Sequence, residues 1–224
     1  MKKYIYYFLL LSCLTFAWSA CTNENYEAGD GANSFLRADF GMAHTQRAKQ
    51  ISSFTTDDSD NLVLTQPIDA SWADQADSLY RALFFYEKVD GNKAKPTSIR
   101  PVPVLNLRPA ESVQQIKTDP VKFESSWISS NKSFLNLSIY LKTGKTDEID
   151  AKQEVGMILD NVQASQNGRK HYYITLYHAQ NGVPEYYSAH TYLSIPLKSL
   201  LQSGDSITLS VNTYDGIIVK RLEY

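Results

Sequence analysis

Cysteine is scarce in this sequence, which has only Cys13 and Cys21 among its 224 residues. Cys13 lies inside an apolar N-terminal stretch, so a secreted form that loses this stretch would keep one cysteine and form no internal disulfide. A small exported domain without disulfides depends on its apolar core for stability. A lone thiol in an oxidising compartment is a liability unless it is covalently capped.

Long apolar segments are equally rare. The only one, Tyr4–Ala17, is shorter than the roughly 20 residues that a membrane-spanning helix needs. It follows the positive start Met1-Lys2-Lys3 and has the length of the apolar region of a signal peptide. No second segment could anchor the chain, so any membrane attachment would come from the N-terminus.

The end of this segment resembles a lipobox, the motif in which a lipoprotein signal peptidase cuts before a lipidated cysteine. Trp18-Ser19-Ala20-Cys21 places small residues just before the cysteine, although Trp18 stands where Leu or Val is usual. We therefore expect a signal peptide over residues 1–20 and lipidation of Cys21, which would also cap the lone thiol. An ordinary secretory signal with an incidental cysteine is the alternative. Residues 21–33, with Gly29 and Gly31, predict a flexible tether.

Runs of basic residues are absent. The net charge is −2, and loss of Lys2 and Lys3 with the signal peptide lowers it to −4. Nucleic-acid binding requires a positive surface, so this class of partner is not expected. The membrane, reached through the lipid, is the one partner that the sequence predicts directly.

Helical periodicity is nearly missing after residue 33, and alternation of apolar and polar residues dominates instead. The fold class predicted is all-β: a small OB-like barrel over residues 34–108, a linker over 109–120, and a seven-stranded β-sandwich over 121–224. Asp57–Asn61 is predicted to be a solvated turn, and 69–77 a helical turn. The five barrel strands are expected at Ser34–Phe40, Arg47–Phe54, Leu62–Thr65, Leu79–Val89 and Ile99–Leu107.

The sandwich strands alternate most clearly in Phe134–Lys142, where every second residue from Leu135 to Leu141 is apolar. One helical turn is expected over Pro196–Leu201. The other six strands are expected at Phe123–Ile128, Val155–Val162, Lys170–Ala179, Glu185–Ile195, Ser206–Thr213 and Ile217–Leu222.

Several of these segments resemble the NigD-like lipoproteins of Bacteroidota. The resemblance is strongest over 119–128, 134–140 and 173–178, and in Pro184-Glu185-Tyr186-Tyr187. It implies an N-terminal OB domain and a C-terminal β-sandwich, and the family name implies an association with bacteriocin immunity. It supplies no catalytic residues. In these bacteria acidic residues after the lipidated cysteine direct export to the cell surface, and here only Glu24 and Glu27 are present. We expect a lipid anchor in the outer membrane. The sequence does not distinguish between the cell surface and the periplasmic face as the location of the folded part.

A tyrosine- and histidine-rich hairpin is the most suggestive candidate site. Asn181-Gly182 is a strong turn signal, and pairing around it would align strands 170–179 and 185–195. The resulting face could be a flat platform for a glycan or a protein, or ordinary cross-strand aromatic packing. The platform residues would be His171, Tyr173, Tyr177, Tyr186, His190 and Tyr192.

Catalytic and metal-binding motifs are missing. There is no Gly-x-Ser-x-Gly elbow, no phosphate-binding glycine loop and no His spacing typical of metal sites. No cofactor, metal or enzymatic activity is therefore expected. The leading hypothesis is a non-catalytic, lipid-anchored binding protein of the cell envelope. The alternatives are a bacteriocin-immunity-type protein and a glycan-binding accessory protein or weak hydrolase.

Overall fold

The structure is a computed structural model that describes residues 36–145 and 151–224. The predicted signal peptide, Cys21 and the tether 21–33 lie outside the described residues, as does the start of the first predicted strand at Ser34. In the described part of the chain no helix is long and apolar enough to cross a membrane.

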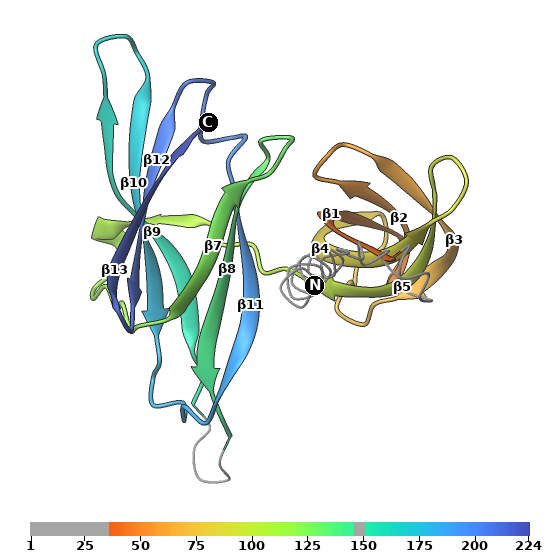
Figure 1. Cartoon of the computed structure of the whole chain (residues 1–224), viewed down its shortest axis with the longest axis horizontal. Coiled ribbons are helices and arrows are strands. Elements are labelled where there is room, and N and C mark those ends of the chain that lie inside the picture. The colour runs from red at the N-terminus through yellow and green to blue at the C-terminus, as the bar shows by residue number, and fades with distance from the viewer. Residues whose placement is uncertain (1–35, 146–150) are drawn as a thin grey trace, which may run out of the picture. The chain divides into compact units, whose positions relative to one another are not determined.

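The N-terminal half of the described chain is a closed five-stranded barrel (Figure 1). Its strand order is β1-β2-β3-β5-β4, and β3 runs parallel to β5 while the neighbouring pairs on either side are antiparallel. This order is that of an OB-type barrel, as the sequence pattern predicts. The strands are β1 (Leu36–Arg47), β2 (Gln50–Thr56), β3 (Asn61–Asp69), β4 (Ser78–Lys88) and β5 (Lys93–Pro101).

The barrel core is aromatic. Phe84 lies between Phe54 and Tyr86, with ring centroids 5.0 and 4.9 Å away, and all three side chains are buried. The helical turn predicted over 69–77 is wrong: β3 continues to Asp69, and the residues that follow form turns without a helix. Ala70 and Ala73 are buried there against the barrel core, so tertiary packing determines the conformation of this segment.

The C-terminal half is a β-sandwich of two sheets (Figure 1). One sheet has the order β13-β12-β10-β9-β6 and the other β11-β8-β7. The strands are β6 (Leu107–Pro109), β7 (Lys122–Ile128), β8 (Phe134–Thr143), β9 (Glu154–Ala164), β10 (Lys170–Ala179), β11 (Tyr187–Pro196), β12 (Ser206–Thr213) and β13 (Gly216–Glu223). The seven predicted sandwich strands are all present, and β6 is additional.

Alternating apolar side chains from both sheets form one core. Leu135, Leu137 and Ile139 of β8 are fully buried and belong to the same cluster as Ile174 and Leu209 of the opposite sheet. The alternation read in the sequence of β8 therefore identifies its buried face correctly.

The sandwich begins earlier in the chain than the predicted linker allows. β6 pairs in parallel with β9, and Val104 forms a bridge with Ser194. Within 109–120 there is one 3-10 turn, Ala110–Ser112, and Thr118 bridges His178 of β10. Much of the segment that reads as a linker is thus hydrogen-bonded to the sandwich. The turn predicted over 196–201 is present, because Leu200 and Leu201 donate to the Leu197 carbonyl.

A buried arginine connects residues from distant parts of the sequence. Arg81 of β4 donates to both carboxylate oxygens of Asp57, at 2.5 and 2.7 Å, and to Ser194 and Asn136 at 3.1 and 3.0 Å. The Arg81 side chain is 1% exposed and that of Asp57 14%. The sequence predicts a solvated turn over 57–61. The structure differs at its first residue, because Asp57 is the acidic partner of a buried ion pair.

Candidate functional site

The predicted hairpin around Asn181-Gly182 is wrong. β10 pairs with β9 and β12, whereas β11 pairs with β8 in the other sheet. Asn181 and Gly182 do adopt positive φ angles of 49° and 76°, as a tight turn requires, but the loop crosses from one sheet to the other. The two strands each have an apolar face, and both faces are buried in the same core. The crossing places β10 in one sheet and β11 in the other, so that the two apolar faces meet across the core.

The six predicted platform residues consequently lie in different places. His171 and Tyr173 are on the outer face of β10, and His190 and Tyr192 belong to β11. Tyr177 is 6% exposed and lies under Arg108, whose guanidinium carbon is 4.9 Å from the ring centroid. These residues do not form one continuous face.

His171 and Tyr173 lie within two rows of polar side chains that cross four strands of the larger sheet. Residues directly opposite one another in a sheet point to the same side, so strand register defines each row. We call these eight residues the polar sheet face. The first row is Gln163, His171, Ser206 and Glu223, and the second is Asn161, Tyr173, Thr208 and Arg221.

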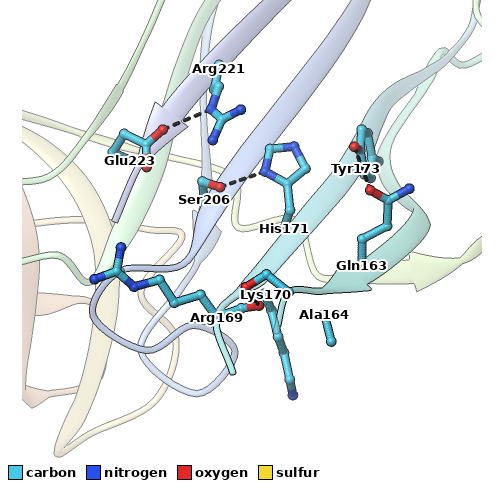
Figure 2. Close-up of a pocket in the computed structure, with 11 residues that line it drawn as sticks. Gln163, Ala164, Arg169, Lys170, His171, Tyr173, Ser206, Arg221 and Glu223 are labelled. Carbon is cyan, nitrogen blue, oxygen red and sulfur yellow. Dashed lines mark hydrogen bonds and ion pairs between the residues drawn. The ribbon is translucent and has the colours of Figure 1, made fainter. Parts of the chain in front are cut away.

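A hollow of about 370 Å³ opens at the end of this face where the β9–β10 turn projects (Figure 2). Its walls include Arg169 from the turn, Lys170 from the start of β10 and Arg221 from β13. Gly204 forms part of the lining with a φ of 91°, and a Cβ atom there would lie 2.8 Å from Nε of Arg169. Glycine at this position is therefore what lets the Arg169 side chain lie along the loop.

Hydrogen bonds hold the side chains of the hollow in fixed positions. The two ring nitrogens of His171 lie 2.6 Å from Ser206 Oγ and 2.8 Å from Thr208 Oγ1. The Tyr173 hydroxyl donates to Gln163 Oε1 at 3.0 Å, and its ring meets His171 edge-on with centroids 4.5 Å apart. Because the Gln163 amide oxygen accepts the hydrogen bond from Tyr173, the orientation of the amide is set, and its nitrogen remains available as a hydrogen-bond donor to a ligand.

One buried carboxylate supports the floor of the hollow. Asp205 is 4% exposed and accepts hydrogen bonds from the backbone N–H groups of Gln202 and Lys170, at 2.9 and 2.8 Å. These two backbone hydrogen bonds, that of Gln202 first, hold the pKa of Asp205 below its ordinary value. Asp205 is therefore ionised at neutral pH and fixes the loop against the start of β10.

His190 belongs to a separate cluster on the smaller sheet, with Ser138, Glu124 and Tyr140. Its Nε2 lies 2.6 Å from Ser138 Oγ and 3.0 Å from Glu124 Oε2, and its ring stacks on Tyr140 with centroids 4.5 Å apart. The Ser138 hydroxyl donates to Glu124, and this hydrogen bond is the main reason that the pKa of Glu124 is lowered. Tyr192 completes the cluster beside His190, at 4.5 Å between centroids.

This Ser-His-Glu cluster does not have the geometry of a hydrolytic triad. In a triad the serine and the carboxylate bind opposite ring nitrogens of the histidine, whereas here both approach Nε2. Ser138 is also 1% exposed, so its hydroxyl has no open path to a substrate. The arrangement serves packing and orientation of β7, β8 and β11.

The three histidines of the sandwich each contact different residues and do not lie together. His178 Nδ1 lies 2.9 Å from the Asp119 carbonyl, His171 contacts Ser206 and Thr208, and His190 contacts Glu124. Over residues 36–145 and 151–224, no group of three or more His, Cys, Asp or Glu side chains is placed to hold a metal ion.

Of the eleven residues that line the hollow, only His171 and Tyr173 were anticipated from the sequence; the other nine include Gln163, Arg169, Arg221 and Glu223. A signal for two of them was present, because Arg221 and Glu223 fall on the alternate positions of a strand whose other face is partly buried. Strand order across the sheet was the missing information.

An OB-type barrel followed by an eight-stranded sandwich defines the class of protein. Residues 103–222, more than half of the chain, match the NigD-like C-terminal beta sandwich domain. The chain therefore belongs to the NigD-like family, and the resemblance noted in its sequence is confirmed.

Solved structures share the fold over most of the chain. A NigD-like immunity protein from Bacteroides caccae superposes with a TM-score of 0.64 and 22% identity, covering 82% of this chain and 91% of that one. A protein from Parabacteroides distasonis, provisionally named toxin-related, gives 0.62 and 16%, covering 84% and 93%. A protein from Bacteroides fragilis, provisionally named a lipoprotein, gives 0.56 and 12%, covering 84% and 96%. No curated protein matches. At these identities the likeness shows the fold alone.

Proposed function

We propose that this chain is a non-catalytic, lipid-anchored binding protein of the outer envelope, and that the polar sheet face is its binding surface. The observation that carries the proposal is the two-row arrangement of eight polar and aromatic side chains that ends in a hollow. Small-molecule sites combine a concave surface with a few fixed polar groups, and the bonded His171, Tyr173 and Gln163 supply such groups.

The anchoring part of the proposal depends on Cys21. The signal-like residues 1–20 precede it, and one solved structure of the same fold is provisionally named a lipoprotein. Mass spectrometry of the N-terminal peptide from membranes tests it: diacylglycerol on Cys21 is the expected result, and an unmodified Cys21 contradicts it. Proteinase treatment of intact cells then separates the cell surface, where the body is cut, from the periplasmic face, where it is protected.

The binding part is tested with matched double variants. Tyr173→Ser with Arg221→Ser changes the polar sheet face, and Tyr214→Ser with Lys198→Ser makes the same kind of change at exposed positions elsewhere. A saccharide panel and solubilised envelope fractions are screened with wild type and both variants. A ligand lost only in the first variant supports the proposal, whereas equal binding by all three proteins contradicts it. Hydrolysis of any panel member would instead favour the weak-hydrolase alternative.

An immunity-type function is the second candidate. A solved relative carries that name, and two adjacent tyrosines, Tyr186 and Tyr187, are 70% and 61% exposed. Tyrosine is enriched in protein–protein interfaces, so this pair suits a protein partner. A deletion strain should then become more sensitive to a toxin from a related strain, and a Tyr186→Ser, Tyr187→Ser allele should fail to restore resistance. Unchanged sensitivity in the deletion strain removes this candidate.

A further inference from the structure

The hollow differs in charge from the rest of the protein. Arg169, Lys170 and Arg221 line it, against a single acidic lining residue, Glu223, in a chain whose net charge is −2. Arg221 donates to Glu223 only through Nε, at 2.9 Å. Among the described residues, no hydrogen bond engages its terminal guanidinium nitrogens, the guanidinium of Arg169 or the ammonium of Lys170. The hollow thus offers the Arg169 guanidinium and the terminal nitrogens of Arg221 to a ligand, whereas the Lys170 side chain points away from His171 and Arg221 (Figure 2).

The rest of the lining does not suit a simple inorganic anion. Tyr173 presents an aromatic ring that is held by its bond to Gln163 and by the edge contact with His171. The Gln163 amide nitrogen is a donor, and the Glu223 carboxylate is an acceptor that a phosphate or sulfate ion would avoid. Hydroxyl groups can bind both kinds of partner, and the apolar face of a sugar ring can pack on a tyrosine.

We propose that the hollow binds an acidic saccharide unit, a sugar that carries a carboxylate or a sulfate. This inference rests on the proposed function and names the ligand class of the same surface. The acidic group would bind the Arg169 guanidinium, since arginine can bind it through two parallel hydrogen bonds, and Arg221, on the other side of Glu223, would add electrostatic attraction. The ring of one sugar unit would pack on Tyr173 with a hydroxyl on Gln163, and a second unit would reach Glu223, which lies three strands away from Gln163 in the same row. The volume of about 370 Å³ is at the small end of ligand sites, which span about 300–1,000 Å³, so one or two sugar units fit best.

Calorimetric titration of the processed chain tests the ligand class with four probes. They are digalacturonate, a sulfated chondroitin disaccharide, neutral galactobiose and a short oligothymidylate. One of the two acidic disaccharides should bind at least about tenfold more tightly than galactobiose, and the one that does identifies carboxylate or sulfate as the preferred group. Its affinity should fall as salt is raised from 50 to 300 mM. Equal affinity for galactobiose, or preference for oligothymidylate, overturns the inference.

Variants assign the binding to this hollow. Arg169→Gln and Arg221→Gln should each weaken the acidic disaccharide about tenfold and galactobiose by a smaller factor, and Lys198→Gln serves as the exposed control. Tyr173→Phe keeps the ring and should retain most of the affinity, whereas Tyr173→Ala should lose it. Thermal melts identify variants that fail to fold. Undiminished binding by a folded Arg169→Gln, Arg221→Gln double variant overturns the inference. If wild type ignores both acidic probes but binds another panel ligand through the polar sheet face, the inference fails and the proposed function stands.

Discussion

Replacing Arg81 by Met should strongly destabilise the protein. Arg81 makes four hydrogen bonds, two to Asp57 and one each to Ser194 and Asn136, and its side chain is 1% exposed. Removing one partner of a buried ion pair typically costs about 3–5 kcal/mol, because the other charge stays buried without compensation. Asp57 is 14% exposed and can be partly hydrated, so we expect a loss near the lower end, about 3 kcal/mol.

Equilibrium urea denaturation measures this loss. With slopes of roughly 1–3 kcal/mol per M, the midpoint should fall by roughly 1–3 M. Arg100→Met, at an exposed arginine of the same barrel, should change stability by less than about 0.5 kcal/mol. The double variant Arg81→Met, Asp57→Leu should recover much of the loss, since it leaves no charge without a partner. A single-variant loss below about 1 kcal/mol, or a double variant that is no better than the single one, would refute the reasoning.

Three further predictions concern the sandwich. Leu137→Ala removes a fully buried side chain from the core and should lower the free energy of unfolding by about 2–5 kcal/mol, measured in urea, and a change under about 1 kcal/mol would mean that the core is not packed as described. Gly204→Ala meets both a φ of 91° and the side chain of Arg169, so it should lose about 1–3 kcal/mol and weaken any ligand of the hollow. Asp205→Asn should lose about 1.5–3 kcal/mol at pH 7, because a charged acceptor of two backbone N–H groups is removed. Since the folded-state pKa of Asp205 is lowered, its contribution is present above the unfolded pKa of about 3.9 and is lost as the pH falls through the folded value. The stability difference between wild type and Asp205→Asn should therefore narrow below about pH 4, and a gap that stays constant to pH 2 would contradict the assignment.

The strands could be predicted from sequence because each carries its own alternation. Leu135, Leu137 and Ile139 mark the buried face of β8 without reference to any other segment, and β10 and β12 are equally legible. Pairing could not be predicted in the same way. Asn181-Gly182 forms the expected tight turn, yet β10 and β11 separate into different sheets, because partner choice depends on apolar faces far apart in the sequence.

The site was harder to predict than the fold for the same reason. The alternation of the strand predicts that His171 and Tyr173 share one face, but Arg221 and Glu223 join them only through two intervening pairings, β10 with β12 and β12 with β13. Asp57 and Arg81 were missed because an aspartate-rich segment reads as solvated until its partner is known.

Closure of the barrel has a consequence for how the protein behaves at high concentration. A closed barrel has no edge strand, whereas the larger sheet of the sandwich has β13 as one of its edges. Ile217 and Val219 of β13 are 71% and 61% exposed, and Lys220 and Arg221 follow directly. Charges on an edge strand oppose unwanted pairing between molecules. Neutralising these two cations should make β13 the strand at which molecules pair to form fibrils or soluble aggregates. The barrel, which has no edge strand, should not take part in this pairing.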